Sequence, residues 1–219
     1  MNQQEVQNQS PFRQRLGRAI KALALCLALL TGLVTLSACQ SWKITPPSDV
    51  QNPVRVFLNE YGRHTTVAFP AGTKTYVEFG FGEWHFYGRE QQGVGSSLRA
   101  IGGAGRGALS RREIITENID DEGFARAAGS LRSVGIDVET TRMQDLKQLL
   151  EERWQHAPER VVRGRDHIEV RQTTGGYHLF RNSNAVSAGW LRKMGADVQG
   201  NPVLSNFEVV GSVQEDQAE

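Results

Sequence analysis

The chain has 219 residues and a formal net charge of +1, with 25 Lys and Arg against 24 Asp and Glu. This balance gives no long-range attraction for nucleic acid or for anionic lipid, so we expect no nucleic-acid partner. The only two cysteines, Cys26 and Cys39, lie near the N-terminus. The rest of the chain therefore has no thiol for catalysis, for a disulfide or for a cysteine-ligated metal.

The N-terminal segment has the order of an export signal, with basic residues, an apolar run over residues 22–36 and then small residues. The run ends in the four residues LSAC, closing at Cys39, which resemble the bacterial lipobox. The resemblance implies that residues 1–38 are removed and that acylated Cys39 binds the membrane. Gln40 after it implies the outer membrane, with the domain in the periplasm. One alternative is an uncleaved anchor, because about 17 apolar residues can just span a bilayer core. The other is an ordinary signal peptide in which LSAC occurs by chance.

Residues 39–53 contain adjacent prolines and little periodicity, so we expect a lipidated tether leading into a single domain over residues 54–210. Alternating apolar residues between positions 54 and 79 predict three closely spaced strands, and this spacing predicts an antiparallel meander. Residues 80–107 are rich in glycine but have neither GxGxxG nor GxxxxGK[ST], so they predict a mobile surface loop and no nucleotide site.

Two helices are predicted next. The first begins at a cap formed by Asp120 or Asp121 and ends at Gly135. The second begins with capping-box spacing at Thr141 and ends before Pro158. The apolar stripes that we expect to face the core are Phe124, Ala127, Ala128 and Leu131 in the first helix and Met143, Leu146, Leu150 and Trp154 in the second.

Residues 168–180 are predicted to be extended, and a third helix follows that is ended by Gly195. Ser183 lies at or just before the N-terminus of this helix. The acidic tail over residues 211–219 is predicted to be disordered. Closely spaced strands with helices later in the chain indicate the α+β class, an antiparallel sheet with packed helices.

Three motifs together resemble an uncharacterised bacterial family, a domain of unknown function sometimes encoded near urease genes. They are Gly62-x-His64-Thr65, then EFGFGExxFY over residues 78–87, and then YHLFRNSN over residues 177–184, which leads into WLRxxG over residues 190–195. That family is similar to circularly permuted NlpC-type, papain-like hydrolases. The resemblance covers most of residues 54–205 and implies a permuted papain-like domain.

In that family a cysteine stands where this chain has Ser183, at a helix N-terminus whose backbone N–H groups favour the thiolate. Carried over to this chain, the resemblance implies three roles: Ser183 as nucleophile, His64 as its base, and Glu78 as the group that orients the base. Asn182 and Asn184 are expected to support the helix entrance by binding backbone.

A serine hydroxyl is a far weaker nucleophile than a thiolate, which leaves three interpretations of Ser183. It is a helix cap without chemistry, a member of a binding cleft that has lost catalysis, or a working nucleophile. His64 can equally be a structural strand histidine, and Glu78 can simply pair with an arginine.

The sequence favours a lipid-anchored envelope protein whose hydrolase-derived cleft binds a peptide or acyl group and is catalytically degenerate. An active amidase or esterase using Ser183, His64 and Glu78 is one alternative, and a purely structural lipoprotein is the other. The histidines show no metal-site spacing such as HExxH, so we expect no metal and no cofactor.

Overall fold

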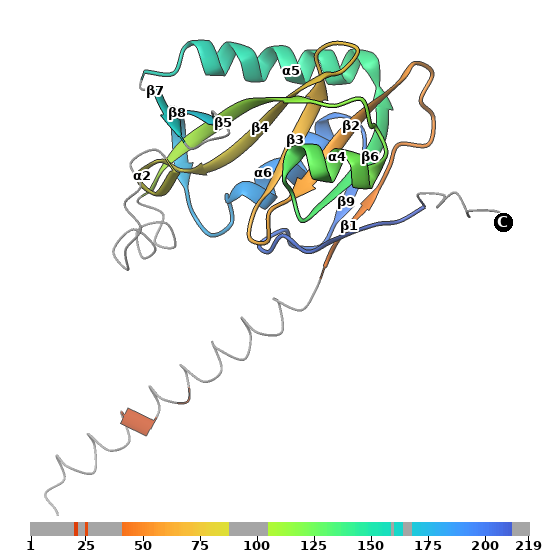
Figure 1. Ribbon diagram of the computed structural model, residues 1–219. Helices are drawn as coiled ribbons and strands as arrows, with labels where there is room; N and C mark the ends of the chain where they lie inside the picture. The colour runs from red at the N-terminus through yellow and green to blue at the C-terminus, as the bar shows by residue number, and fades with distance from the viewer. Residues whose placement is uncertain are drawn as a thin grey trace, which may run out of the picture. The chain divides into compact units, whose positions relative to one another are not determined.

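The computed structural model describes residues 20, 21, 25, 41–87, 105–158, 160–163 and 168–211. The chain divides into two compact units, Met1–Gln40 and Ser41–Glu219, and the strands described below belong to the second (Figure 1). Cys39 and residues 212–219 of the predicted tail lie outside the described residues. Within the described ranges, no helix combines the length and the apolar character needed to cross a bilayer.

Seven strands form the main sheet, in the order β6-β2-β3-β4-β5-β8-β7. Their bounds are β2 (Pro53–Glu60), β3 (Thr65–Pro70), β4 (Thr75–Glu83), β5 (Gly105–Ile115), β6 (Arg132–Glu139), β7 (Arg160–Arg163) and β8 (Ile168–Tyr177). Every neighbouring pair is antiparallel. Strands β2, β3 and β4 pair in sequence order, which confirms the predicted meander.

The glycine-rich stretch over residues 80–107, predicted as a loop, belongs in part to strands. Strand β4 continues to Glu83 because Phe81 is buried in the core and pairs with Leu109 of β5. A Cβ at Gly80 would lie 2.5 Å from the Ser110 hydroxyl oxygen, so a larger residue at this position would displace that side chain. A short helix, α2 (Trp84–Tyr87), follows β4. Residues 88–104 of the predicted loop lie outside the described residues.

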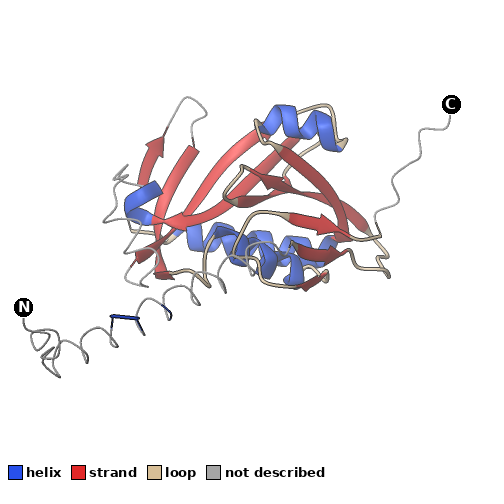
Figure 2. Cartoon of the chain, turned by 90° about the horizontal axis from the view of Figure 1, so that it is seen from below, coloured by secondary structure: helices blue, strands red, loops and turns tan. Residues whose placement is uncertain are grey.

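Helices pack on both faces of the main sheet (Figure 2). They are α4 (Asp121–Ala128), α5 (Thr140–Gln155) and α6 (Ser183–Lys193). Side chains alternate between the two faces along a strand, so Val67 of β3 packs in the core formed with α5 and α6, whereas its neighbour Ala68 packs with Phe124 of α4. This arrangement confirms the predicted α+β class, an antiparallel sheet with packed helices.

Helix α4 is shorter than the sequence predicts. It begins where Asp120 accepts a hydrogen bond from the backbone N–H of Gly123 at 2.7 Å, as expected of a cap. It ends at Gly129, whose φ of 63° is left-handed, so the predicted continuation to Gly135 is wrong. Leu131 and Ala127 were both predicted to face the core, but Leu131 is 77% exposed and Ala127 is exposed as well.

Helix α5 matches its predicted apolar face. The predicted stripe of α5, Met143, Leu146, Leu150 and Trp154, is buried. The capping box predicted at Thr141 does not form, because α5 begins at Thr140 and its N-cap residue, Glu139, makes no side-chain cap bond. Helix α6 ends at Lys193, its C-cap is Met194, and Gly195 follows with a φ of 99°.

A second, three-stranded sheet joins the two ends of the folded unit. Its strands are β1 (Trp42–Thr45), β9 (Asp197–Gln199) and β10 (Phe207–Val209). Strand β1 lies between the other two, parallel to β10 and antiparallel to β9. The prediction of a tether over residues 39–53 is therefore wrong for residues 42–45, because the alternating Trp42 and Ile44 are fully buried in the core.

Candidate functional site

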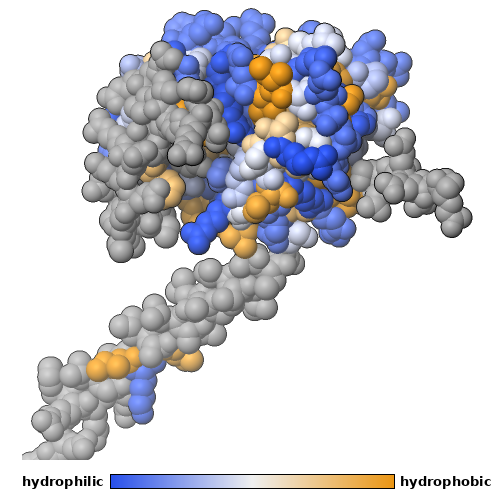
Figure 3. Space-filling view, viewed as in Figure 1, coloured by the Kyte–Doolittle hydropathy of each residue, from blue (hydrophilic) through white to orange (hydrophobic). Residues whose placement is uncertain are grey.

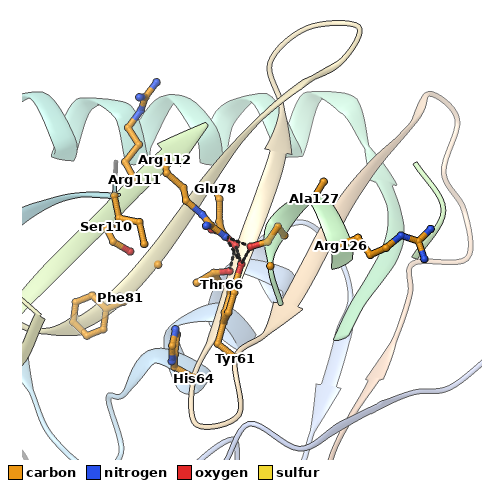
Figure 4. Close-up of a pocket in the computed structure, with 14 residues that line it drawn as sticks. Tyr61, His64, Thr66, Glu78, Phe81, Ser110, Arg111, Arg112, Arg126 and Ala127 are labelled. Atoms are coloured by element: carbon orange, nitrogen blue, oxygen red, sulfur yellow. Dashed lines mark hydrogen bonds and ion pairs between the residues drawn. The ribbon is translucent and has the colours of Figure 1, made fainter. Parts of the chain in front are cut away.

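A pocket of about 490 Å³ lies where the main sheet meets the C-terminal end of α4 (Figure 4). The residues that line it are Tyr61, His64, Thr66, Glu78, Gly80, Phe81, Ser110, Arg111, Arg112, Arg126, Ala127, Ala128, Gly129 and Ile168. Two of the three predicted catalytic residues, His64 and Glu78, therefore share this pocket. Ser183 is not among the described residues that line it.

Glu78 is the centre of a buried polar network. Its Oε1 accepts hydrogen bonds from Asn59 Nδ2 at 2.7 Å, from the Tyr61 hydroxyl at 2.8 Å and from the Thr66 hydroxyl at 2.5 Å. Its Oε2 accepts from Arg112 Nε at 2.5 Å. The arginine supplies the countercharge that a buried carboxylate needs. Pairing with an arginine was one of the two sequence interpretations of Glu78.

Arg112 joins this network to α4. Its Nη2 donates to the carbonyl oxygen of Ala128 at 2.6 Å and also to the Tyr61 hydroxyl. Ala128 is the last residue of α4, where carbonyl groups have no partner within the helix and carry partial negative charge. Arg112 therefore satisfies the helix end and holds the last turn of α4 at the pocket.

Tyr61 connects the network with His64. The two rings stack with centroids 5.1 Å apart and planes 15° apart. Burial, together with the negative charge of Glu78, raises the pKa of Tyr61, so its hydroxyl remains a donor. Burial lowers the pKa of His64. The charge of Glu78 raises this pKa and the charge of Arg112 lowers it, and burial is the largest effect. The imidazole is therefore neutral at neutral pH.

The other two arginines at the pocket direct their charges elsewhere. Figure 4 shows the guanidinium groups of Arg111 and Arg126 pointing away from the Glu78 network. Arg111 pairs with Glu151 of α5 at 3.3 Å, and the largely exposed Arg126 lies 3.8 Å from Glu122. The charge that faces the interior is therefore the ion pair of Arg112 with Glu78, which is neutral overall.

Ser183 is the first residue of α6 and is only 4% exposed. The residue before it forms the cap, because Asn182 Oδ1 accepts from the backbone N–H of Ala185 at 2.9 Å. The capping role that the sequence left open for Ser183 is therefore taken by Asn182. Asn182 also donates to the carbonyl oxygen of Leu179 at 3.1 Å, as expected for a residue that supports the helix entrance.

Asn184 binds both sequence neighbours of His64. Its Oδ1 accepts from the Thr65 hydroxyl at 3.2 Å, and its Nδ2 donates to the carbonyl oxygen of Arg63 at 3.5 Å. The structure thus brings the N-terminus of α6 against the segment that carries His64. Helix α6 packs on the α5 side of the sheet, however, whereas the His64 ring lines the pocket beside α4.

Sequence reasoning missed four members of the network, namely Asn59, Tyr61, Thr66 and Arg112. One local signal was available: Glu78 lies between Val77 and Phe79 in an apolar strand, so its burial demands a countercharge. The identity of the cation depends on the pairing of β4 with β5, which sets Arg112 opposite Glu78.

Among the described residues, no group of three His, Cys, Asp or Glu side chains is placed to hold a metal ion. The chain matches no family model, no curated protein and no solved structure. The resemblance to permuted papain-like hydrolases therefore rests on the sequence motifs alone and stays a prediction.

Proposed function

We propose that this chain is a lipid-anchored protein of the cell envelope that binds a peptide or acyl group in the pocket beside His64 and does not cleave it. The observation that carries the proposal is the bonding of Glu78. Its two carboxylate oxygens accept hydrogen bonds from Asn59, Tyr61, Thr66 and Arg112, and the group forms an ion pair with Arg112. A buried carboxylate needs such partners, so these contacts support a structural role for Glu78 in the sheet.

The position of Ser183 also supports binding without cleavage. A serine nucleophile needs a base within hydrogen-bond reach and space for the substrate carbonyl. Ser183 is buried in the first turn of α6, and the pocket is lined by other residues. Of the three side chains that the motifs assign to catalysis, His64 and Glu78 line this pocket, and Ser183 is not among the described residues that do.

The pocket itself suits a small organic group. Its volume of about 490 Å³ lies within the range of small-molecule sites, roughly 300–1,000 Å³. Tyr61, Phe81 and Ile168 give it aromatic and aliphatic walls, and the Glu78–Arg112 pair gives it a polar wall. Such a lining favours an amphipathic ligand, such as the carbonyl end of an acyl group or a short peptide.

An active serine hydrolase is the second candidate, and the contacts of Asn184 favour it. They hold the N-terminus of α6 against residues 63–65. The N–H groups of a helix N-terminus can stabilise an oxyanion. The contacts of Asn184 would therefore hold an oxyanion-binding site close to the segment that carries His64.

Labelling with a fluorophosphonate separates the two candidates. The membrane-extracted protein and its Ser183→Ala and Ser183→Cys variants would be treated in parallel. The binding proposal expects no labelling of the unmodified protein. Labelling that is lost in Ser183→Ala would instead establish a working nucleophile.

Binding is tested with a dansyl-labelled fatty acid and a dansyl-labelled dipeptide. Ala127 is exposed and lines the pocket, so Ala127→Trp should obstruct it. Glu122→Trp, on the same helix and outside the lining, is the matched control. We expect saturable binding of at least one probe to the unmodified protein and to the control, with loss in Ala127→Trp. Equal binding by all three proteins would contradict the proposed pocket.

A further inference from the structure

Four exposed apolar side chains lie around the point where the chain enters its fold. They are Leu131, Leu179, Phe180 and Leu204, with exposed fractions of 77%, 39%, 71% and 42%, and we call them the entry patch. Strand β1 begins at the lower edge of the folded unit in Figure 1, and Figure 3 shows apolar surface among polar surface on the lower part of the same view. An apolar patch at one end of a polar surface suggests a contact with another apolar medium.

Hydrogen bonds fasten the entry patch to β1. The indole nitrogen of Trp42 donates to the carbonyl oxygen of Leu204 at 3.1 Å. Asn182 Nδ2 donates both to the carbonyl oxygen of Val203 at 2.9 Å and to that of Leu179 at 3.1 Å. The turn that carries Leu179 and the loop that carries Leu204 are thus tied to each other and to the first strand.

Leu131 joins the patch through the turn at Gly62. Its backbone N–H donates to the carbonyl oxygen of Glu60 at 2.8 Å. Ser205, next to Leu204, donates its hydroxyl to the carbonyl oxygen of Gly62 at 2.6 Å. The exposed Arg63 follows Gly62 in the same turn. One end of the folded unit therefore combines the apolar patch, a basic side chain and the start of β1.

The predicted lipid anchor would hold this end close to a membrane. Only Gln40 and Ser41 separate Cys39 from Trp42, and three residue steps span at most about 11 Å. The opposite end of β3, at Pro70, is five residue steps from Thr65, or about 17 Å along the strand. Because the tether is shorter than β3, the end of the folded unit at Trp42 is the end that can touch the lipid.

We propose that the entry patch rests on a phospholipid bilayer, with Phe180 and Leu204 among the lipid head groups. This proposal depends on the proposed acylation of Cys39. Removing these side chains from water is favourable, and Arg63 would meet the phosphate groups of the lipids. His64 lies two residues from Gly62, so its end of the pocket would face the membrane and receive a ligand from the lipid surface.

Site-specific lipid quenching tests the orientation. Single-cysteine variants Phe180→Cys and Leu204→Cys would carry a bimane label. Ile115→Cys is the matched control, because Ile115 is 75% exposed and pairs with Thr75 at the far end of β4. Each protein would be expressed from residue 1, purified after processing, and placed in vesicles of phosphatidylethanolamine and phosphatidylglycerol that contain doxyl-labelled lipid. The protein without an added cysteine is a second control, because any bimane on it must be attached to Cys26 or Cys39.

We expect severalfold stronger quenching at residues 180 and 204 than at residue 115. Equal quenching at the three positions would overturn the proposed orientation. A spectral shift at residue 180 that depends on protein concentration and not on lipid would assign the patch to a second copy of the chain, and would also overturn it.

Mass spectrometry of the same preparation separates the two levels of the proposal. Acylated Cys39 without selective quenching would contradict the orientation and leave the anchor intact. If Cys39 is not acylated and instead reacts with bimane in the protein that has no added cysteine, the proposed anchor and the proposed orientation are both contradicted.

Discussion

Arg112 and Glu78 form a buried ion pair, 2.5 Å from Nε to Oε2, that connects the middle of the main sheet to the last turn of α4. The pair lies between the pocket and the helix end, so the same two residues fix the shape of the cavity and the position of α4. A change in either one should therefore alter stability and pocket geometry together.

Replacing Arg112 by Met would leave the Glu78 carboxylate buried without its countercharge. Removing one partner of a buried pair typically destabilises a protein by about 3–5 kcal/mol, and we expect a loss of this size in urea unfolding. Arg126→Met is the control, because that side chain is 71% exposed and surface changes usually stay within about 0.5 kcal/mol. Similar losses in both variants would contradict the expectation that the buried ion pair contributes more to stability than an exposed arginine.

The folded protein should resist protonation of His64. Its pKa is lowered from 6.5 by burial, so below that pH the unfolded chain binds the proton more readily than the folded chain does. Stability should then fall as the pH drops below about 6.5, and the decline should flatten once the pH passes the folded-state pKa. We expect His64→Phe, which retains a ring to stack on Tyr61, to lose this part of the pH dependence when urea unfolding is compared at neutral and mildly acidic pH. An unchanged pH profile would contradict the lowered pKa.

Asn182→Ala should destabilise the protein more than the loss of an ordinary cap. Asn182 caps α6 and also ties Leu179 to Val203, whereas Asp120 caps α4 with the single bond to Gly123. A cap alone contributes about 1 kcal/mol. We therefore expect a greater loss in Asn182→Ala than in Asp120→Ala when their urea midpoints are compared, and equal losses would show that the ties to Leu179 and Val203 add nothing.

Trp42→Ala should strongly destabilise the folded unit, although the residue lies in the segment predicted as a tether. Trp42 is fully buried, and removing a large buried aromatic side chain costs about 3–5 kcal/mol. Lys43→Ala on the same strand is the control, because the Lys43 side chain is 58% exposed. Differential scanning calorimetry should show a large decrease in melting temperature for the first variant only. A small decrease for Trp42→Ala would mean that β1 is dispensable.

The elements that sequence analysis predicted correctly are those whose stability is local. The meander of β2, β3 and β4 follows from alternation and short turns, and the buried face of α5 follows from helical spacing. The strands that it missed depend on distant partners. Strand β1 has four residues and pairs with segments near the other end of the chain, and β6 completes the edge beside β2, so neither is defined by its own periodicity.

The candidate site divides in the same way. The motifs led to His64 and Glu78, which do share a pocket. They could not reveal that Glu78 binds Arg112 and Tyr61, since these contacts depend on strand register and on where α4 ends. Nor could they show that Ser183 lies outside the pocket lining, because the side of the sheet that a helix covers is decided by tertiary packing.

The position of β1 between β9 and β10 imposes an order on biosynthesis. The first strand of the folded unit finds its partners at residues 197–199 and 207–209, so the small sheet cannot form until nearly the whole polypeptide has been made. In a chain that crosses a membrane N-terminus first, β1 would have no strand to pair with until residues 197–209 emerge, and Trp42 and Ile44 would stay unburied by the small sheet until then. A truncation before residue 197 should therefore yield a product that chaperones retain or proteases destroy, even though the main sheet is complete.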